Sequence, residues 1–146
     1  MFFSLSKEDF LSYFISQINN FFPDKNPIKK SDILDAFNVS IRRIETCFKK
    51  LKNSKINKYI LKNNRLYFNH LNTNHYSIFL YFLSNTCYNL KKQITICDKI
   101  FYLNKTLHSV DLFYEIKLPN IFYLIHPAGT ILGLIILIIF WCIKIV

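Results

Sequence analysis

Apolar residues in the first part of the chain recur at helical spacing. Ser6 precedes two acidic residues and then an apolar series at intervals of three and four, formed by Phe10, Leu11, Phe14, Ile15 and Ile18. A hydroxyl residue directly before such a series is typical of a helix N-cap, because its oxygen accepts a hydrogen bond from a free amide of the first turn. The pattern predicts a capped amphipathic helix that ends in the stretch from Asn19 to Asp24.

A second helical pattern follows. Its apolar positions, which we expect on the inner face, are Ile33, Leu34, Phe37, Ile41, Ile44, Phe48 and Leu51. Ser31 is the predicted N-cap. The polar Asn38 and Ser40 predict a break that divides this helix in two.

The middle of the chain changes character twice. Residues 53–74 are rich in Asn and Lys and weakly periodic, which predicts a loop with a short strand near Leu66–Phe68. A strongly apolar helix is predicted from Thr73 or Asn74 through Leu83, with residues 84–93 as its polar continuation and a turn. In this helix we interpret Tyr76, Phe79, Tyr81 and Phe82 as core residues. A last helix is predicted over about 94–107.

Short strands and turns are predicted from Val110 onward, where β-branched and aromatic residues alternate with Pro119 and Pro127. The expected fold is therefore mainly α. It consists of a helical N-terminal domain (1–108), a short β segment (109–133) and an apolar tail (134–146).

Composition permits several anionic partners without selecting one. The 146 residues carry a formal net charge of +10, mostly from lysine. A basic chain suits nucleic acid, a membrane surface or the phosphates of coenzyme A. Lys, Asn, Ile, Phe and Tyr are all abundant while Gly and Ala are scarce, which the codon usage of an AT-rich genome also explains. We favour this compositional explanation.

The cysteines and histidines predict no metal site. Cys47, Cys87, Cys97 and Cys142 form no C-x-x-C pair, which argues against a zinc site or a disulfide framework and for a reducing compartment. The spacings of the first three histidines, His70, His75 and His108, fit no ligand pattern, so we expect these residues on the surface or at helix edges. The N-terminus lacks the basic region of a signal peptide, so the expected location is cytoplasmic.

Residues 31–51 also permit a helix-turn-helix interpretation. Asn38–Ser40 would form the turn, and Arg42, Arg43, Lys49 and Lys50 would face phosphate. The turn lacks a glycine, so we favour a structural helix with a solvated basic face. Nucleic acid is accordingly not an expected partner.

An acid and a histidine near the end of the chain occur in a distinctive context. Ser109-Val110-Asp111 is followed by His126 fifteen residues after the acid (126 − 111 = 15), within the run His126-Pro127-Ala128-Gly129-Thr130-Ile131-Leu132-Gly133. This arrangement resembles the start of the catalytic domain of bacterial serine acetyltransferases, which are hexapeptide-repeat acyltransferases. The resemblance covers most of residues 62–133 and is strongest from Cys97.

The resemblance implies a left-handed parallel β-helix, assembled as a homotrimer, that transfers an acetyl group from acetyl-CoA to serine or another small alcohol in cysteine biosynthesis. It implies His126 as the general base and Asp111 as the acid that orients it, with no metal. A histidine suits the removal of a hydroxyl proton, and a carboxylate on its other nitrogen fixes the tautomer.

Two departures from the family qualify this expectation. The family places an acidic residue directly before the catalytic histidine to hold the amino group of serine, whereas Ile125 stands here. The later coils, which supply substrate-binding residues and the coenzyme A site, have no counterpart in these 146 residues. A solenoid needs about three stacked repeats to bury its core. We therefore expect a truncated and inactive form.

The apolar tail has two interpretations. When AT-rich codons are assumed from Gly133 onward, a frame shifted by two nucleotides encodes INYFDYFLVYQNC, which resembles the continuation of the family. We favour a frameshift product for this reason. The alternative is a small basic helical protein anchored in the membrane by its C-terminus, through residues 131–143, although these thirteen residues are fewer than the roughly 20 of a spanning helix.

Overall fold

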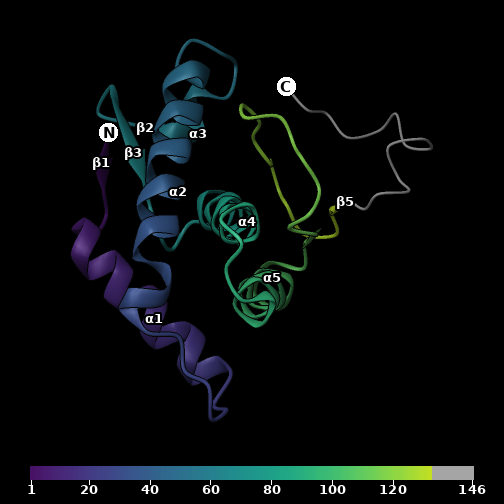
Figure 1. The fold of residues 1–146 in the computed structure, drawn as a ribbon. Coiled ribbons are helices and arrows are strands. Elements are labelled where there is room, and N and C mark those ends of the chain that lie inside the picture. The colour runs from purple at the N-terminus through teal and green to yellow at the C-terminus, as the bar shows by residue number, and fades with distance from the viewer. Residues whose placement is uncertain (133–146) are drawn as a thin grey trace.

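The computed structural model describes residues 1–132, and this part of the chain is mainly helical, as predicted (Figure 1). The helices are α1 (Lys7–Phe21), α2 (Lys30–Leu51), α3 (Asn57–Ile60), α4 (Thr73–Asn89) and α5 (Ile94–His108). The strands are β1 (Phe2–Phe3), β2 (Leu61–Lys62), β3 (Arg65–Phe68), β4 (Asp111–Leu112) and β5 (Ile131–Leu132).

The start of α1 is confirmed and the start of α2 is not. Ser6 caps α1, because its Oγ accepts a hydrogen bond from the Asp9 amide at 3.0 Å. Helix α2 begins one residue before the predicted cap Ser31. Its first turn is closed instead by Asp32, whose carboxylate accepts the Lys29 amide at 2.8 Å.

The predicted break in α2 is wrong, and with it the helix-turn-helix interpretation. The helix is continuous through Asn38, whose side chain is exposed and leaves the backbone helical. The Ser40 hydroxyl donates to the Ala36 carbonyl at 2.8 Å, so its polar group is satisfied within the helix. The predicted position of Leu34 on the inner face is also wrong, since this residue is 39% exposed.

A small sheet covers part of the polar middle segment. The predicted strand near Leu66–Phe68 is confirmed as β3, which pairs with β1 in parallel and with β2 in antiparallel orientation. Asn63 (φ 52°) and Asn64 (φ 58°) form the two-residue turn between β2 and β3. Two residues with positive φ give the twist that a tight hairpin needs. Helix α3 and strand β2 were not predicted.

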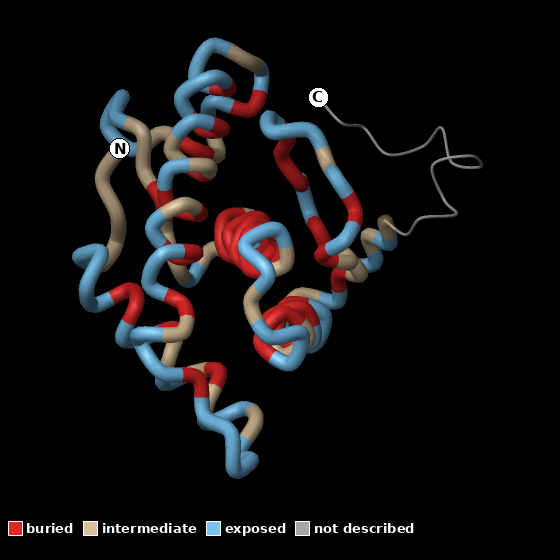
Figure 2. The backbone as a smooth tube through the Cα atoms, viewed as in Figure 1, coloured by how far each residue is buried: buried red, intermediate tan, exposed pale blue. Residues whose placement is uncertain are grey.

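Helix α4 is the centre of the core and lies between α2 and α5 (Figure 1). It is buried on almost all sides, as its red ring in Figure 2 shows. The predicted core positions Tyr76, Phe79, Tyr81 and Phe82 are confirmed as buried. Burial also extends to the polar residues Ser84, Asn85 and Thr86, which continue the helix inside the protein.

The chain after α5 returns along the helices and closes a short parallel pair. Strand β4 pairs with β5 in the register Asp111↔Ile131 and Leu112↔Leu132. The intervening chain packs its apolar side chains into the same core as the helices. The core is thus continuous across residue 108, and the predicted domain boundary there stays a prediction.

Positive charge is concentrated at one end of the molecule, at the last turn of α2, at α3 and on the β2–β3 hairpin (Figure 1). The seven cations of this basic end are all exposed and are Lys49, Lys50, Lys52, Lys55, Lys58, Lys62 and Arg65. No acidic residue occurs between Glu45 and Asp98. The helix C-terminus, which carries a partial negative charge, stabilises the first of these lysines.

None of the helices within residues 1–132 is both long and apolar enough to cross a membrane. The predicted tail, 134–146, and with it the frameshift and membrane-anchor interpretations, lies outside the described residues.

Candidate functional site

Asp111 lies at the start of β4, directly after the end of α5. Ser109 (φ 53°) is in the left-handed region and turns the chain out of the helix. The turn places Asp111 beside the last turn of α5, where its carboxylate pairs with Lys105 at 2.6 Å. This ion pair raises the pKa of the Lys105 amine, since the neighbouring carboxylate favours the charged form.

His126 lies in the connection from β4 to β5, shortly before β5 begins. It is exposed and has a positive φ of 55°, which is unusual for a residue with a side chain. The following turn is closed by backbone hydrogen bonds, from the Gly129 amide to the Ser109 carbonyl and from the Asp111 amide to the Thr130 carbonyl, both at 2.8 Å.

The structure brings the backbones of the two predicted site residues into one coil but does not join their side chains. Within residues 1–132, the carboxylate of Asp111 is bonded to Lys105, and no hydrogen bond connects it to His126. The ring of His126 therefore lacks the orienting partner that was predicted for it. The role of both residues stays a prediction.

The segment 113–124, which we call the anchored limb, is fixed to the helices by hydrogen bonds to its backbone. The Tyr81 hydroxyl donates to the Ile116 carbonyl at 2.6 Å and accepts from the Leu118 amide at 3.0 Å. Asn85 donates to the Tyr114 carbonyl at 2.7 Å. Buried polar residues of α4 thus hold the loop that leads to His126.

His75 is a buried core residue, so the predicted position on the surface or at a helix edge is wrong. Its Nδ1 accepts the Asn69 amide at 3.0 Å and its Nε2 donates to the Tyr59 carbonyl at 2.8 Å. This pattern assigns the proton to Nε2. Burial lowers the pKa of His75 to about 4, because the charged ring would lose its hydration. The histidine therefore acts as a neutral connector of α3, β3 and α4.

Of the other two histidines, His108 lies at the end of α5, as predicted, whereas His70 lies half-buried in the turn after β3. His70 shares a hydrogen bond of 2.7 Å with the Ser4 hydroxyl. His108, in the last turn of α5, packs edge-on against Tyr76, and burial lowers its pKa to about 4. Both of its ring nitrogens are buried without a hydrogen-bond partner among the described residues.

Arg43 is a site residue that the sequence did not identify. It was considered only as a phosphate contact of a helix-turn-helix, but it points into the protein. Its Nη1 donates to the Asn85 side-chain oxygen at 2.9 Å, the Thr86 hydroxyl at 2.8 Å and the Phe82 carbonyl at 3.2 Å. The absence of an acid three or four residues away on α2 was the available signal, since it leaves this arginine without a local partner.

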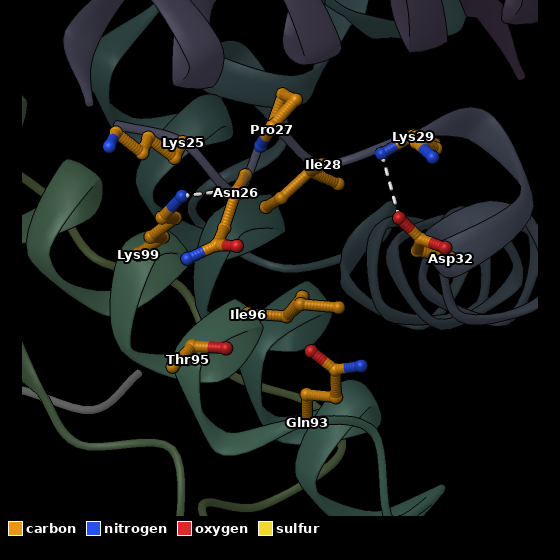
Figure 3. A pocket seen from close by; sticks show the side chains of 10 residues that line it. All are labelled: Lys25, Asn26, Pro27, Ile28, Lys29, Asp32, Gln93, Thr95, Ile96 and Lys99. Atoms are coloured by element: carbon orange, nitrogen blue, oxygen red, sulfur yellow. Dashed lines mark hydrogen bonds between the residues drawn. The ribbon is translucent and has the colours of Figure 1, made fainter. Parts of the chain in front are cut away.

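A separate cavity of about 300 Å³ lies between the start of α2 and the start of α5 (Figure 3). Ile28 and Ile96 form its apolar wall. Lys99 donates to the Asn26 carbonyl at 2.7 Å and pairs with Asp24 at 2.8 Å, which lowers the pKa of that acid. The charge of Lys99 is therefore neutralised, and the other two lysines of the cavity wall, Lys25 and Lys29, are exposed.

The cysteines of the described part are three free, buried thiols. Burial raises the pKa of Cys47 and Cys97 to about 11 and that of Cys87 to about 12, so these thiols are poor nucleophiles at neutral pH. No group of three or more metal-ligating side chains comes together within residues 1–132.

Comparison with known proteins adds no relative, since no protein-family model, curated protein or solved structure matches this chain.

Proposed function

We propose that this chain carries the helical domain and the first coil of a serine acetyltransferase-like acyltransferase, which transfers an acetyl group from acetyl-CoA to a small hydroxyl acceptor. The observation that supports the proposal is the parallel pairing of β4 with β5. The paired residues Asp111 and Ile131 are only twenty positions apart (131 − 111 = 20), and the connection contains no helix.

A connection of this kind is uncommon. Parallel neighbours are usually joined by a crossover helix, because the chain must return to the same end of the sheet. A β-solenoid instead returns through one irregular coil and places the next strand directly on the first. The coil here has left-handed residues at Ser109, His126 and Gly129, where the chain changes direction.

In the proposed reaction, the imidazole of His126 takes the proton of the acceptor hydroxyl while the oxygen attacks the thioester carbonyl. The carbon–sulfur bond then breaks, and the leaving coenzyme A thiolate takes the proton from the imidazolium. Asp111 would hold the other ring nitrogen and stabilise this cation. Lys105 occupies only Oδ2 of this carboxylate, so Oδ1 is the oxygen that would accept the ring N–H. Ile125 precedes the histidine, so the acceptor is proposed only as a small alcohol.

The proposal is tested first at the level of the gene. Genomic DNA is resequenced from the codon of Thr130 to several hundred bases downstream. We expect a shifted frame that continues into Gly-rich hexapeptide repeats. If no such frame exists, the membrane anchor through residues 131–143 becomes the better explanation of the tail.

The frame-repaired protein is then assayed for release of the coenzyme A thiol from acetyl-CoA, with serine and other small alcohols as acceptors. His126→Gln should reduce kcat by about 10²–10⁴-fold, which is the contribution of a general base. Asp111→Asn should reduce it as well, whereas the matched amide substitution Glu115→Gln should not. Full activity in the His126→Gln variant would refute the catalytic assignment.

A further inference from the structure

Arg43 is a half-buried cation without an acidic partner. The five ion pairs found among residues 1–132 do not include it. Its three hydrogen-bond acceptors, on Phe82, Asn85 and Thr86, are neutral oxygens. Removing a charge from water without a counter-charge is costly, so a bound anion would stabilise this residue.

The guanidinium is held in one orientation. All three of its hydrogen bonds use Nη1, and the group lies over the Phe82 ring at 4.3 Å. Within the described residues, Nε and Nη2 donate no hydrogen bond. These two groups form one edge of the planar fork, which is the edge that binds a carboxylate or phosphate through two parallel hydrogen bonds.

Two cavities adjoin this residue. One, of about 420 Å³, is lined by Arg43 together with Arg42, Thr46 and Asn120. The other, of about 480 Å³, is lined by Arg43 together with Lys117, Asn85 and Asn89. Both volumes lie within the range of small-molecule sites, about 300–1,000 Å³.

The charges that surround these cavities are mainly positive. Arg42 and Lys117 are exposed on their walls and add two cations to Arg43. The one acid that lines either cavity is Glu115, which is exposed. The amide group of Asn120 supplies a further donor, whereas that of Asn89 already donates to the Asn85 carbonyl at 2.8 Å. A small anion would therefore find a fixed fork, two flanking cations and one side-chain amide.

We propose that Arg43 and the two cavities beside it form a binding site for a small oxyanion, either a carboxylate or a phosphate group. The anion supplies the counter-charge that the protein does not. The site is built by α2, α4 and the anchored limb, and it does not include Asp111 or His126. It is therefore independent of the proposed acyltransferase function.

The test uses the full 146-residue protein and two probes, inorganic phosphate and acetate, each titrated calorimetrically at constant ionic strength against sodium chloride. We expect one of the probes to bind at a single site and to raise the melting temperature above that in chloride. The stronger probe identifies the chemical class. Arg43→Lys keeps the charge but loses the fork, so it should weaken binding about tenfold or more.

A matched pair of variants locates the site. Lys117→Gln removes a cation from the wall and should weaken binding several-fold, whereas Lys29→Gln removes another exposed cation, at the separate cavity beside the start of α2, and should not. If Arg43→Lys does not fold, the lysine pair alone decides. The proposal is overturned if neither probe binds beyond chloride, or if Lys117→Gln and Lys29→Gln have equal effects.

Discussion

Two neighbouring parts of the C-terminal segment are held in different ways. The anchored limb, 113–124, buries Tyr114, Ile116 and three consecutive residues, 122–124, and binds α4 through Tyr81 and Asn85. Residues 125–132, which we call the outer turn, are mostly exposed and are held by backbone hydrogen bonds to residues 109–111. The proposed base His126 belongs to the outer turn.

The anchored limb supports the coil, whereas the outer turn carries the proposed catalytic residue. Side-chain packing fixes the limb on the helices, so the position of the coil is determined by the core. Among the described residues the outer turn is packed less closely: Ile125 (37%) and Ile131 (54%) are exposed, while Pro127 is buried and Leu132 packs against the core. A reactive group on such a turn needs neighbouring coils to fix its geometry, because catalysis requires groups held within fractions of an ångström.

The largest effect is expected from the core between the helices. Phe79 is fully buried and lies against the rings of Phe10, Phe37 and Phe68. Phe79→Ala should lower the free energy of unfolding by about 3–5 kcal/mol, measured by urea denaturation. Ile131→Ala, in the outer turn, should change it by no more than about 0.5 kcal/mol. Comparable losses in the two variants would abolish the distinction between core and turn.

The second-largest effect on stability is expected from a fall in pH, through a histidine that packs against the anchored limb. His75 contacts the ring of Tyr123 and has its pKa lowered to about 4, below the unfolded value of 6.5. Between these two values the unfolded chain binds more protons, so stability falls as the pH falls from 6.5 and this loss ends below about pH 4. The loss expected from His75 alone is about 3 kcal/mol.

This pH dependence is measured as the free energy of unfolding at several pH values from 7 to 4. His75→Gln retains a donor and an acceptor but cannot titrate, so its stability should fall less steeply over the same range. An equally steep fall in this variant would assign the effect to other groups, of which half-buried His108 is the first candidate.

A smaller effect is expected from the hydrogen bonds of the limb itself. Tyr81→Phe removes the hydroxyl that bonds both Ile116 and Leu118, and it should lower stability by about 1–3 kcal/mol. The Leu118 amide should exchange its hydrogen faster in this variant. Tyr102→Phe, at an exposed position, is the matched control and should change neither quantity. Unchanged exchange at Leu118 would show that the limb does not depend on this anchor.

The smallest effect is expected in the outer turn. Gly129 has φ +81°, and a Cβ added there would meet no atom within 4 Å. The cost of Gly129→Ala is therefore limited to backbone strain, about 1 kcal/mol by thermal denaturation. Gly129→Asn should cost less, since Asn tolerates this region. A larger loss in either variant would mean that the turn is packed more tightly than its exposure indicates.

The sequence predicted the helices well where local rules decide them. The hydrogen bond between Ser6 and Asp9 defines the start of α1. The apolar run of α4 is long enough to be buried on almost all sides of the helix. The predicted burial of Leu34 was wrong because helical spacing does not show which neighbours cover that side of α2. The hairpin was missed because its turn, Asn63-Asn64, lacks the glycine of the common two-residue turn pairs.

The candidate sites were less predictable because their partners are distant in sequence. Asp111 was identified, but its bond to Lys105 depends on the left-handed turn at Ser109. The buried ring of His75 is hydrogen-bonded to a carbonyl on α3, and Arg43 is held by Asn85 and Thr86 on another helix. Such pairings follow from tertiary packing, which no local pattern encodes.

The basic end of the molecule has a consequence for how the protein behaves in an electric field. Residues 49–65 carry these seven exposed cations and no acid, while the other twelve cations (19 − 7 = 12) exceed the nine acids by three (12 − 9 = 3). This asymmetry gives the protein an electric dipole toward the α2–α3 end. At salt below about 0.1 M, where screening extends over roughly 10 Å, this dipole orients the molecule on any negatively charged resin or sensor surface. On such a surface the basic end is the side that is attached.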